Sequence, residues 1–209
     1  MRLRNVKGAK EKIENSKYII LNEKEHKGNF NKLFGNDNPI CIEIGTGKGK
    51  FIRQMALNNP DINYIGIEKF DSVIVRALEK VEEEDIPNLR FIRMDANDIE
   101  NVFDKEIDTI YLNFSDPWPK ARHKIRRLTS RNFLHKYDNL FKGKKHIVFK
   151  TDNRHLFEFS VIEFNEYNYT INELCLDLYS EDLTDNVPTE YEEKFHNKGM
   201  PIYKIDVTK

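Results

Sequence analysis

Glycines and carboxylates stand where predicted strands end, and together they could bind a nucleoside that carries a cation. The run EIGTGKGKF holds Glu43, Gly45 and Gly47, and its glycines allow a tight strand-to-helix turn with a ligand close to the backbone. Glu68 ends the next strand, 23 residues after Gly45, where a carboxylate can accept hydrogen bonds from both ribose hydroxyls. Asp95 follows the third strand, where an acid or its neighbouring backbone can contact an adenine amino group.

The ligand predicted from these residues is S-adenosylmethionine. The nicotinamide pattern G-x-G-x-x-G would require glycine at Lys50, and the loop reads G-x-G-x-G instead. An acid such as Glu43 beside the turn is unfavourable for a pyrophosphate and favourable for a cation. S-adenosylmethionine combines the ribose, the adenine and the positive charges that these positions favour.

A second stretch, NFSDPWPKARHKIRRL at residues 113–128, follows the fourth predicted strand. Ligands of open α/β sheets bind outside the carboxyl ends of the strands, so Asp116 is expected near the transferable methyl group. The flanking prolines stiffen the loop, and Trp118 offers a flat apolar surface that could wall a base pocket or pack beneath the loop. A basic block follows, with no acid before Asp138.

The elements that must position these residues alternate along the chain. Apolar runs at 39–45, 63–68, 89–93, 107–113 and 146–150 predict strands covered on both faces. Helical patterns lie between and after them, at 49–58, 71–83, 97–101, 129–140 and 153–166. This alternation predicts a parallel sheet in an α/β fold, closed by two further strands near the end of the chain. Residues 1–38 are expected to form a polar, partly ordered lead-in, and 39–209 a single domain.

Composition and charge distribution indicate what kind of partner the protein binds and where it is located. The net charge of −1 conceals an asymmetry, because residues 151–209 hold 13 acidic and five basic side chains, whereas the first ten residues and 120–136 are strongly basic. Such basic stretches favour a polyanionic partner. No run suggests a signal peptide or a membrane span, so a cytoplasmic location is expected. Cys41 and Cys175 lie in apolar runs and are expected to be reduced and buried, and no metal-ligand spacing is present.

In order along the chain, EIGTGKGKF, IGIEKF, MDAND, NFSDPWPKARHKIRRL, FKTDN and PTEYEEKFHNKGMPIY resemble the bacterial tRNA (guanine-N7-)-methyltransferases over residues 40–203. The S-D-P-W-P-K segment with the basic run carries the most specific part of the resemblance. It implies a class I methyltransferase (Rossmann-like) fold, with a mostly parallel seven-stranded sheet, helices on both faces and an antiparallel C-terminal strand. It also implies methyl transfer from S-adenosyl-L-methionine to N7 of guanine 46 in the tRNA variable loop.

The resemblance assigns roles residue by residue. It implies that Asp116 is catalytic and also contacts the cofactor. The other implied cofactor-binding residues are Glu43, Gly45, Gly47, Glu68 and Asp95. The implied substrate-binding residues are Lys120, Asp152, Thr189, Glu190, Tyr191 and Glu192. The implied RNA-contacting residues are Arg122, Lys124, Arg126 and Arg127, in a run that Ile125 interrupts.

Three other functions compete with this interpretation. Methyltransferases that modify an exocyclic amino group carry D/N-P-P-Y/W at the place of the Asp116 loop, and Trp118-Pro119-Lys120 departs from that pattern. A non-catalytic tRNA-binding module would leave the glycine loop and the strand-end acids unexplained. A nicotinamide dehydrogenase is disfavoured by Lys50. The expected partner is tRNA, with no membrane and no metal, and the chain is expected to be a monomer or homodimer.

Overall fold

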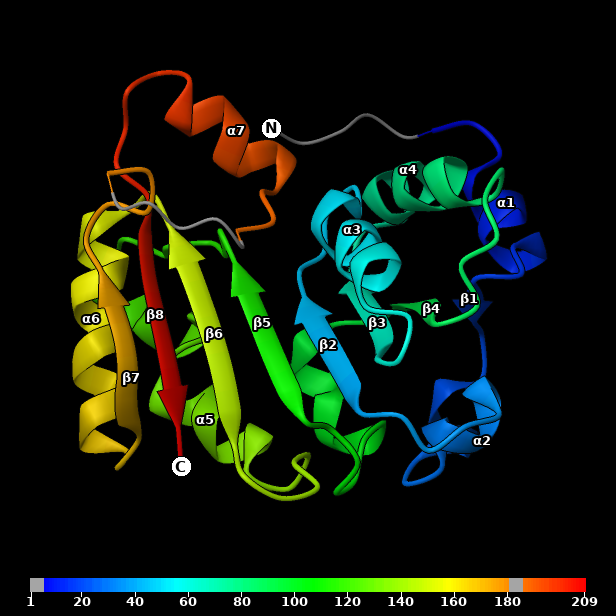
Figure 1. The fold of residues 1–209 in the computed structure, drawn as a ribbon, viewed down its shortest axis with the longest axis horizontal. Helices are drawn as coiled ribbons and strands as arrows, with labels where there is room; N and C mark the ends of the chain where they lie inside the picture. The colour runs from blue at the N-terminus through cyan, green and yellow to red at the C-terminus, as the bar shows by residue number, and fades with distance from the viewer. Residues whose placement is uncertain (1–5, 181–185) are drawn as a thin grey trace.

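A single mixed sheet organises the computed structural model, which describes residues 6–180 and 186–209 (Figure 1). Within these residues eight strands run in the spatial order β1-β4-β3-β2-β5-β6-β8-β7. Their bounds are β1 (Ile19–Ile20), β2 (Ile40–Ile44), β3 (Asn63–Glu68), β4 (Leu89–Arg93), β5 (Thr109–Asn113), β6 (His146–Thr151), β7 (Thr170–Cys175) and β8 (Tyr203–Thr208). β8 pairs antiparallel with both β6 and β7, so β8 alone runs against the other strands (Figure 1).

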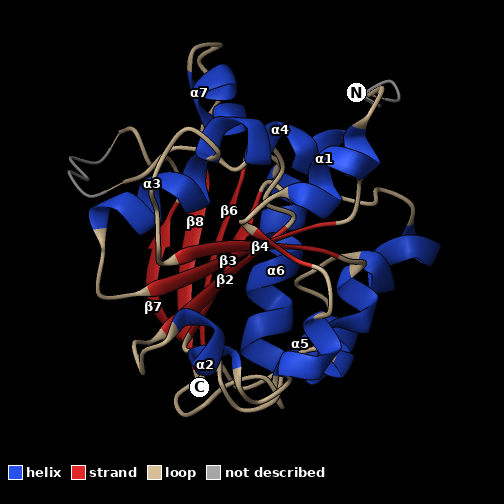
Figure 2. Ribbon diagram, turned by 90° about the vertical axis from the view of Figure 1, so that its right-hand side faces the viewer, coloured by secondary structure: helices blue, strands red, loops and turns tan. Residues whose placement is uncertain are grey.

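Helices cover both faces of the sheet (Figure 2). The α-helices are α1 (Ala9–Asn15), α2 (Phe30–Phe34), α3 (Lys50–Asn58), α4 (Asp71–Val81), α5 (Arg131–Tyr137), α6 (Arg154–Glu166) and α7 (Glu190–His196). Three 3-10 turns complete the described segments: η1 (Glu23–His26), η2 (Ala96–Asn101) and η3 (Ala121–Arg126). Of the helices in this part of the chain, none has the length and apolar character needed to cross a membrane.

The apolar strands form because both of their faces are buried. In β2 the side chains of Ile40, Ile42 and Ile44 enter the core on the side of α5 and α6, whereas Cys41 enters the core beneath α3 and α4. Alternate residues of a strand point to opposite faces, so a strand buried on both faces is apolar at nearly every position. This is the continuous pattern of PICIEI, and β2 pairs in parallel between β3 and β5.

The predicted class I methyltransferase fold is confirmed, including the parallel body and the antiparallel strand near the C-terminus. The sheet has one strand more than the seven expected, because two residues of β1 pair with β4. A strand of two residues lacks the alternation that a sequence pattern needs. The division of the chain at residue 38 stays a prediction, and in the structure Tyr18 and Phe30 of the lead-in are buried in the core.

The parallel strands β2, β3, β4, β5 and β6 all end at one edge of the sheet, the upper edge in Figure 1. The helix α7 lies across this edge, although its sequence neighbours belong to the antiparallel end of the sheet (Figure 1). The fold therefore gathers the ends of five strands and one helix from near the C-terminus around a common site.

Candidate active site

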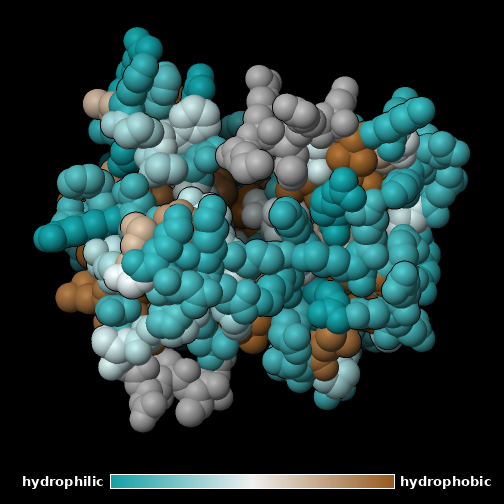
Figure 3. Space-filling model, turned by 90° about the horizontal axis from the view of Figure 1, so that it is seen from above, coloured by the Kyte–Doolittle hydropathy of each residue, from teal (hydrophilic) through white to brown (hydrophobic). Residues whose placement is uncertain are grey.

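A cavity of about 810 Å³ opens at the carboxyl ends of the strands. Residues that follow four strands line it: Gly45 after β2, Glu68 and Lys69 at β3, Asp95 after β4, and Ser115, Asp116 and Trp118 after β5. Viewed onto this edge, a mostly hydrophilic surface is hollowed near its centre, with apolar residues inside the hollow (Figure 3). The size and mixed lining suit a nucleoside-sized ligand.

The glycine loop leaves space where a ligand can approach the backbone. Gly45 and Gly47 have φ of 83° and 61°, and a Cβ at either position would meet no atom within 4 Å. Gly49 has a different task, because its Cβ would lie 2.8 Å from the Cβ of Ala77. The first two glycines thus open the turn toward solvent, and the third lets α3 pack against α4.

Glu43 lies buried beneath this loop, with 1% of its surface exposed. Its Oε1 accepts a hydrogen bond from Nδ2 of Asn113 at 2.8 Å, and its Oε2 accepts one from the hydroxyl of Thr46. Burial raises the pKa of Glu43 to about 7, against the opposing effects of these hydrogen bonds and of the Lys150 charge. A carboxyl group in this state becomes an anion readily when a cation approaches.

Glu68 and Asp95 line the cavity in different electrostatic states. The carboxylate of Glu68 accepts hydrogen bonds from the backbone N–H groups of Gly47, Lys69 and Phe70, and burial raises its pKa despite them. Asp95 binds Nζ of Lys69 at 2.6 Å and caps η2 through the N–H of Asn97, and the Lys69 hydrogen bond is the main cause of its lowered pKa. Of the strand-end acids predicted from the sequence, Glu68 and Asp95 therefore share one cavity, whereas Glu43 lies buried beneath it.

The loop after β5 carries Asp116 between two residues whose backbone conformation few non-glycine residues adopt. Phe114 and Trp118, on either side of it, have φ of 50° and 41°, in the left-handed region. Arg127 fixes the loop from below, because its guanidinium donates to the carbonyl oxygens of Pro117 at 2.9 Å and Trp118 at 3.2 Å. Backbone strain of this kind persists where the surrounding structure enforces it, and it is common at functional sites.

The basic run forms the 3-10 turn η3 beside this loop. Arg122, Lys124 and Arg126 are exposed, and the guanidinium of Arg126 lies 5.0 Å from the centre of the Trp118 ring. Arg127 differs, because it is half-buried, braces the loop and lies over Phe159. Ile125 is 60% exposed and lines the cavity mouth. In the basic run, Arg122, Lys124 and Arg126 are therefore exposed to solvent, whereas Arg127 points inward and supports the loop.

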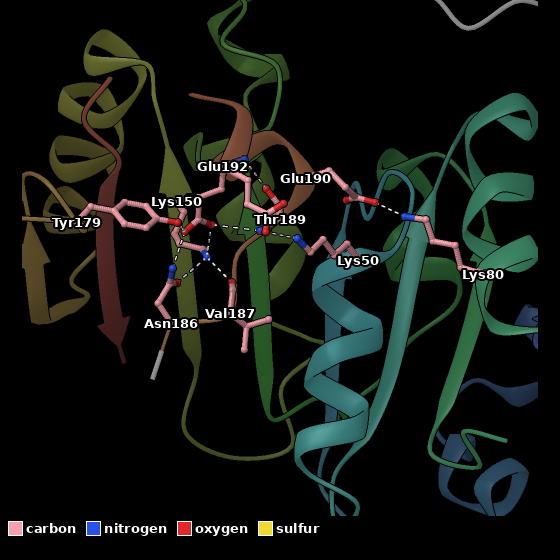
Figure 4. Close-up of polar contacts among 10 residues, drawn as sticks. Lys50, Lys80, Lys150, Tyr179, Asn186, Val187, Thr189, Glu190 and Glu192 are labelled. Atoms are coloured by element: carbon pink, nitrogen blue, oxygen red, sulfur yellow. Dashed lines mark hydrogen bonds and ion pairs between the residues drawn. The ribbon is translucent and has the colours of Figure 1, made fainter. Parts of the chain in front are cut away.

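The predicted substrate segment builds the start of α7. Thr189 is the N-cap of the helix, and its hydroxyl accepts from the N–H of Glu192 at 2.9 Å in a capping box. Glu190 forms an ion pair with Lys80 of α4 (Figure 4). Glu193 forms one with Lys50 of α3. Glu192 points inward and is fully buried. Three of these side chains therefore attach α7 to the domain.

Tyr191 is the member of the segment that packs against the cavity lining, through Phe114. It is 46% exposed, its ring centre lies 5.4 Å from that of Phe114, and it stacks on Phe195. Burial raises its pKa, and the charges of Asp152 and Asp116 raise it further. Asp152 is half-buried, which raises its own pKa, and Lys120 is exposed at the start of η3.

Unsatisfied polar atoms show that the site suits a polar ligand. Oδ1 of Asn113 and Oγ of Ser115 are buried without a hydrogen-bond partner among the residues described; Asn113 ends β5, and Ser115 follows it and lines the cavity. Buried polar atoms normally have a partner, so these two are available to a ligand. Together with Glu68 and the open glycine turn, they fit a ribose and an amino-acid group. In the described ranges, no three His, Cys, Asp or Glu side chains are grouped as metal ligands.

Several residues that build the site are absent from the sequence-based predictions. Asn113 holds Glu43, Phe114 supports Tyr191, and Lys150 binds Glu192. The sequence signal for these residues is a polar or aromatic residue at the carboxyl end of an apolar strand. In HIVFK, for example, the lysine ends a buried strand, so its ammonium group requires a polar partner. The partner of Lys150 lies 42 positions away in the sequence, so the pairing itself leaves no local pattern.

Fold and site together define an α/β methyltransferase. Residues 37–205 match the model of a family described as "Putative methyltransferase". A solved structure titled "Structure of an antibiotic related Methyltransferase" superposes with a TM-score of 0.66 at 18% identity, covering 87% of this chain and 92% of the other, which shows a shared fold.

Comparison with curated sequences defines the family more narrowly. A tRNA (guanine-N(7)-)-methyltransferase from Geobacillus sp. (strain WCH70) is 54% identical over 99% of this chain and 95% of its own length. Another, from Bacillus licheniformis, is 51% identical over 99% of this chain and 98% of its own length. The chain therefore belongs to the tRNA (guanine-N(7)-)-methyltransferase family, as its sequence motifs predict.

Proposed function

We propose that this chain transfers a methyl group from S-adenosylmethionine to N7 of guanine 46 in the tRNA variable loop. The observation that carries the proposal is the cavity that Glu68, Asp95, Asp116 and Trp118 line together at the carboxyl ends of the strands, with Tyr191 packed against Phe114 of the same lining. Relatives named tRNA (guanine-N(7)-)-methyltransferase, at 50–54% identity, support the same substrate and the same reaction. A tRNA substrate favours a cytoplasmic location for the protein.

S-adenosylmethionine, when bound, supplies an electrophilic methyl group on a sulfonium centre. We assign Glu68 to the ribose hydroxyls, Asp95 and its neighbouring backbone to the adenine, and Gly45 and Gly47 to the open turn. Glu43 supports the cationic end of the cofactor from beneath the loop, where its pKa of about 7 lets it ionise as the ligand binds. Asn113 and Ser115 offer the two unpartnered oxygens.

Guanine N7 carries a lone pair at neutral pH, so the chain does not have to remove a proton before the transfer, and a strong general base is not required. The useful contributions are orientation and electrostatics. Asp116 is exposed at the cavity mouth, where a carboxylate can accept hydrogen bonds from guanine N1–H and N2–H and stabilise the positive charge of the methylated ring. We assign a share of this task to Asp152, whose charge acts on Tyr191 as that of Asp116 does.

Outside the cavity, the substrate is a polyanion that must present one base. Arg122, Lys124 and Arg126 face solvent beside the Asp116 loop, and Lys120 precedes them. We assign these cations to tRNA phosphates, with Trp118 and Tyr191 as apolar surfaces beside the base.

A pair of tRNA transcripts tests the proposal. One carries guanine at position 46 and the other carries adenine there, with the rest of the sequence unchanged. With labelled S-adenosylmethionine, we expect label to enter the first transcript and not the second. Equal incorporation into both would refute the assigned position, and no incorporation into either would refute the tRNA substrate.

A further inference from the structure

Two large apolar side chains stay exposed where they line the cavity. Phe70 is 56% exposed and Ile125 is 60% exposed, and Glu68 and Asp95 line the same cavity. A single exposed apolar residue is common on a protein surface, but two that line one cavity offer a surface for an apolar part of a ligand. Ile125 also interrupts the basic run, and a phosphate contact does not account for an apolar side chain at that position.

The two side chains approach the cavity from opposite faces of the sheet. Phe70 is the N-cap of α4, which enters the core on the α3 side through Ile74. Ile125 belongs to η3, which packs against α5, and α5 enters the core on the other face through Phe133. A flat ring that enters between Phe70 and Ile125 therefore meets an apolar side chain on each side.

The polar groups beside these side chains match the edge of an adenosine. Glu68, assigned to the ribose hydroxyls, accepts a hydrogen bond from the N–H of Phe70 at 3.0 Å, so one residue holds this acid and offers the aromatic ring. Asp95, assigned to the adenine, caps η2. Because α5 packs against both η2 and η3, Ile125 lies on the side of the cavity where the adenine edge is placed.

The backbone around Ile125 is held in place by the protein itself. The hydroxyl of the buried Ser130 donates to the carbonyl oxygen of Ile125 at 3.1 Å. Two positions further on, Arg127 donates to two carbonyl oxygens of the loop after β5, which ties the end of η3 to that loop. The exposure of the Ile125 side chain is therefore a property of a fixed turn.

The geometry of η3 brings the two substrates together at Ile125. Residues three apart in a 3-10 turn lie on the same side. His123 and Arg126 follow this rule, because both contact the ring of Trp118, at 5.8 Å and 5.0 Å from its centre. Arg122 lies on the side of Ile125 for the same reason, so a phosphate bound by Arg122 would lie next to the cofactor cavity.

We propose that Ile125 is a cofactor-binding residue, and that Ile125 and Phe70 hold the adenine ring of S-adenosylmethionine between them. The inference rests on the proposed placement of the adenine beside Asp95. It adds a cofactor contact to a run whose cations are assigned to tRNA phosphates, so η3 contributes to both binding sites.

Cofactor affinity in the absence of tRNA tests the inference. Ile125→Ser and Phe70→Ala should each raise the calorimetric Kd of S-adenosylmethionine about tenfold, because each removes the apolar surface on one side of the ring. 5′-Methylthioadenosine has the adenosine but neither the amino acid nor the positive charge, so its Kd should rise by the same factors. Ile162→Ser makes the same change at a 56% exposed residue of α6 outside the cavity lining, and should leave both Kd values unchanged.

A tRNA measurement separates a cofactor contact from an RNA contact at Ile125. In the absence of cofactor, Ile125→Ser should bind tRNA with wild-type affinity and with the wild-type slope of log K against log salt, because no cation is lost. If Ile125 contacted an RNA base instead, the same variant would bind tRNA more weakly and keep the wild-type Kd of S-adenosylmethionine.

Three results would overturn the inference. They are an unchanged Kd of S-adenosylmethionine in Ile125→Ser, an unchanged Kd in Phe70→Ala, or a rise for S-adenosylmethionine without a rise for 5′-methylthioadenosine. A wild-type Tm shows that each variant is folded. Failure of the proposed function is a separate outcome, because a chain that methylates another nucleoside, or no tRNA, still gives adenosine affinities that decide the role of Ile125.

Discussion

The side-chain amide of Asn113 donates to Oε1 of Glu43 across 2.8 Å, linking the ends of β5 and β2 beneath the glycine loop. The same Asn113 leaves its Oδ1 without a partner among the residues described, and it pairs in register with Lys150 of β6. One amide thus connects the carboxyl group proposed for the cationic end of the cofactor with the strand whose Lys150 binds Glu192 of α7. A single row of polar residues across the strand ends therefore links the cofactor site with α7.

The raised pKa of Glu43 predicts pH-dependent cofactor binding. The folded-state pKa of about 7 exceeds the ordinary 4.5, so Glu43 contributes stability below pH 4.5 that is lost as pH rises through 7. A cation beside the carboxylate favours its ionised form, so S-adenosylmethionine should bind about tenfold more tightly at pH 8 than at pH 6, relative to Glu43→Gln. Calorimetry on both proteins cancels the titration of the ligand itself. A wild-type-to-variant affinity ratio that stays constant between the two pH values would contradict this role.

Removing the Asp116 carboxylate should affect turnover above all. Asp116→Ala is expected to lower kcat by about two to three decades at saturating tRNA and cofactor, the scale of losing one preorganised electrostatic group. Single-turnover methylation measures the effect. Asp61→Ala, which removes an exposed acid before β3 at the other edge of the sheet, is the matched control and should retain full kcat. A loss in kcat smaller than about threefold for Asp116→Ala would refute the catalytic role of Asp116.

The exposed cations of η3 predict a salt-dependent tRNA affinity. Arg122→Ala with Arg126→Ala should weaken binding and reduce the slope of log K against log salt by about two units, roughly one for each phosphate contact. Filter binding over a salt series measures the slope. Lys142→Ala with Lys144→Ala removes the same charge from the turn before β6, remote from the cavity, and should leave the slope unchanged. Equal slopes in the two double variants would refute a specific phosphate contact at η3.

Trp118 gives a direct signal of cofactor binding, because it is the only tryptophan of the chain and it lines the cavity. Tryptophan fluorescence should change on titration with S-adenosylmethionine and saturate at the calorimetric Kd. Trp118→Phe should abolish the signal while cofactor still binds. An unchanged spectrum in the wild-type protein at saturating cofactor would mean that Trp118 lies away from the bound ligand.

Because Gly66 is closely packed, adding a methyl group there should destabilise the fold without any change of charge. A Cβ at this position would lie 2.8 Å from ring atoms of Phe91 and 3.1 Å from Cγ2 of Thr46. Gly66→Ala should therefore cost about 1–3 kcal/mol in the free energy of unfolding, as other overpacked sites do. Gly143→Ala adds the same methyl group where nothing lies within 4 Å, and it should be close to neutral. Urea denaturation of the two variants compares them, and equal stabilities would show that Phe91 can move away.

The sequence predicts most of the parallel sheet, because each apolar run carries a local signal and parallel strands bring their carboxyl ends to one edge. For that reason Glu68, Asp95 and Asp116 could be placed in one cavity in advance. Contacts between distant segments have no such signal. The inward direction of Glu192 depends on Lys150, and the attachment of α7 depends on Lys50 and Lys80, all from other elements.

The N-terminal segment illustrates the same limit. Its polar composition predicts a lead-in, but α1 packs through Ala9 and Ile13 against the core beneath α4. A few widely spaced apolar residues are enough to dock a helix when the rest of the domain offers an apolar surface to pack against. Arg127 is a similar case, because its sequence neighbours suggest a phosphate contact, whereas its guanidinium braces the backbone of Pro117 and Trp118.

The measurement that tests the central claim most directly is methyl transfer from labelled S-adenosylmethionine to unmodified bulk tRNA, with the product nucleosides separated by mass spectrometry. We predict label in 7-methylguanosine, absent from the same reaction with Asp116→Ala at equal time. Label in a nucleoside methylated at an exocyclic amino group would contradict N7 chemistry. No labelled nucleoside, with cofactor binding intact by calorimetry, would contradict the assignment of tRNA as the substrate.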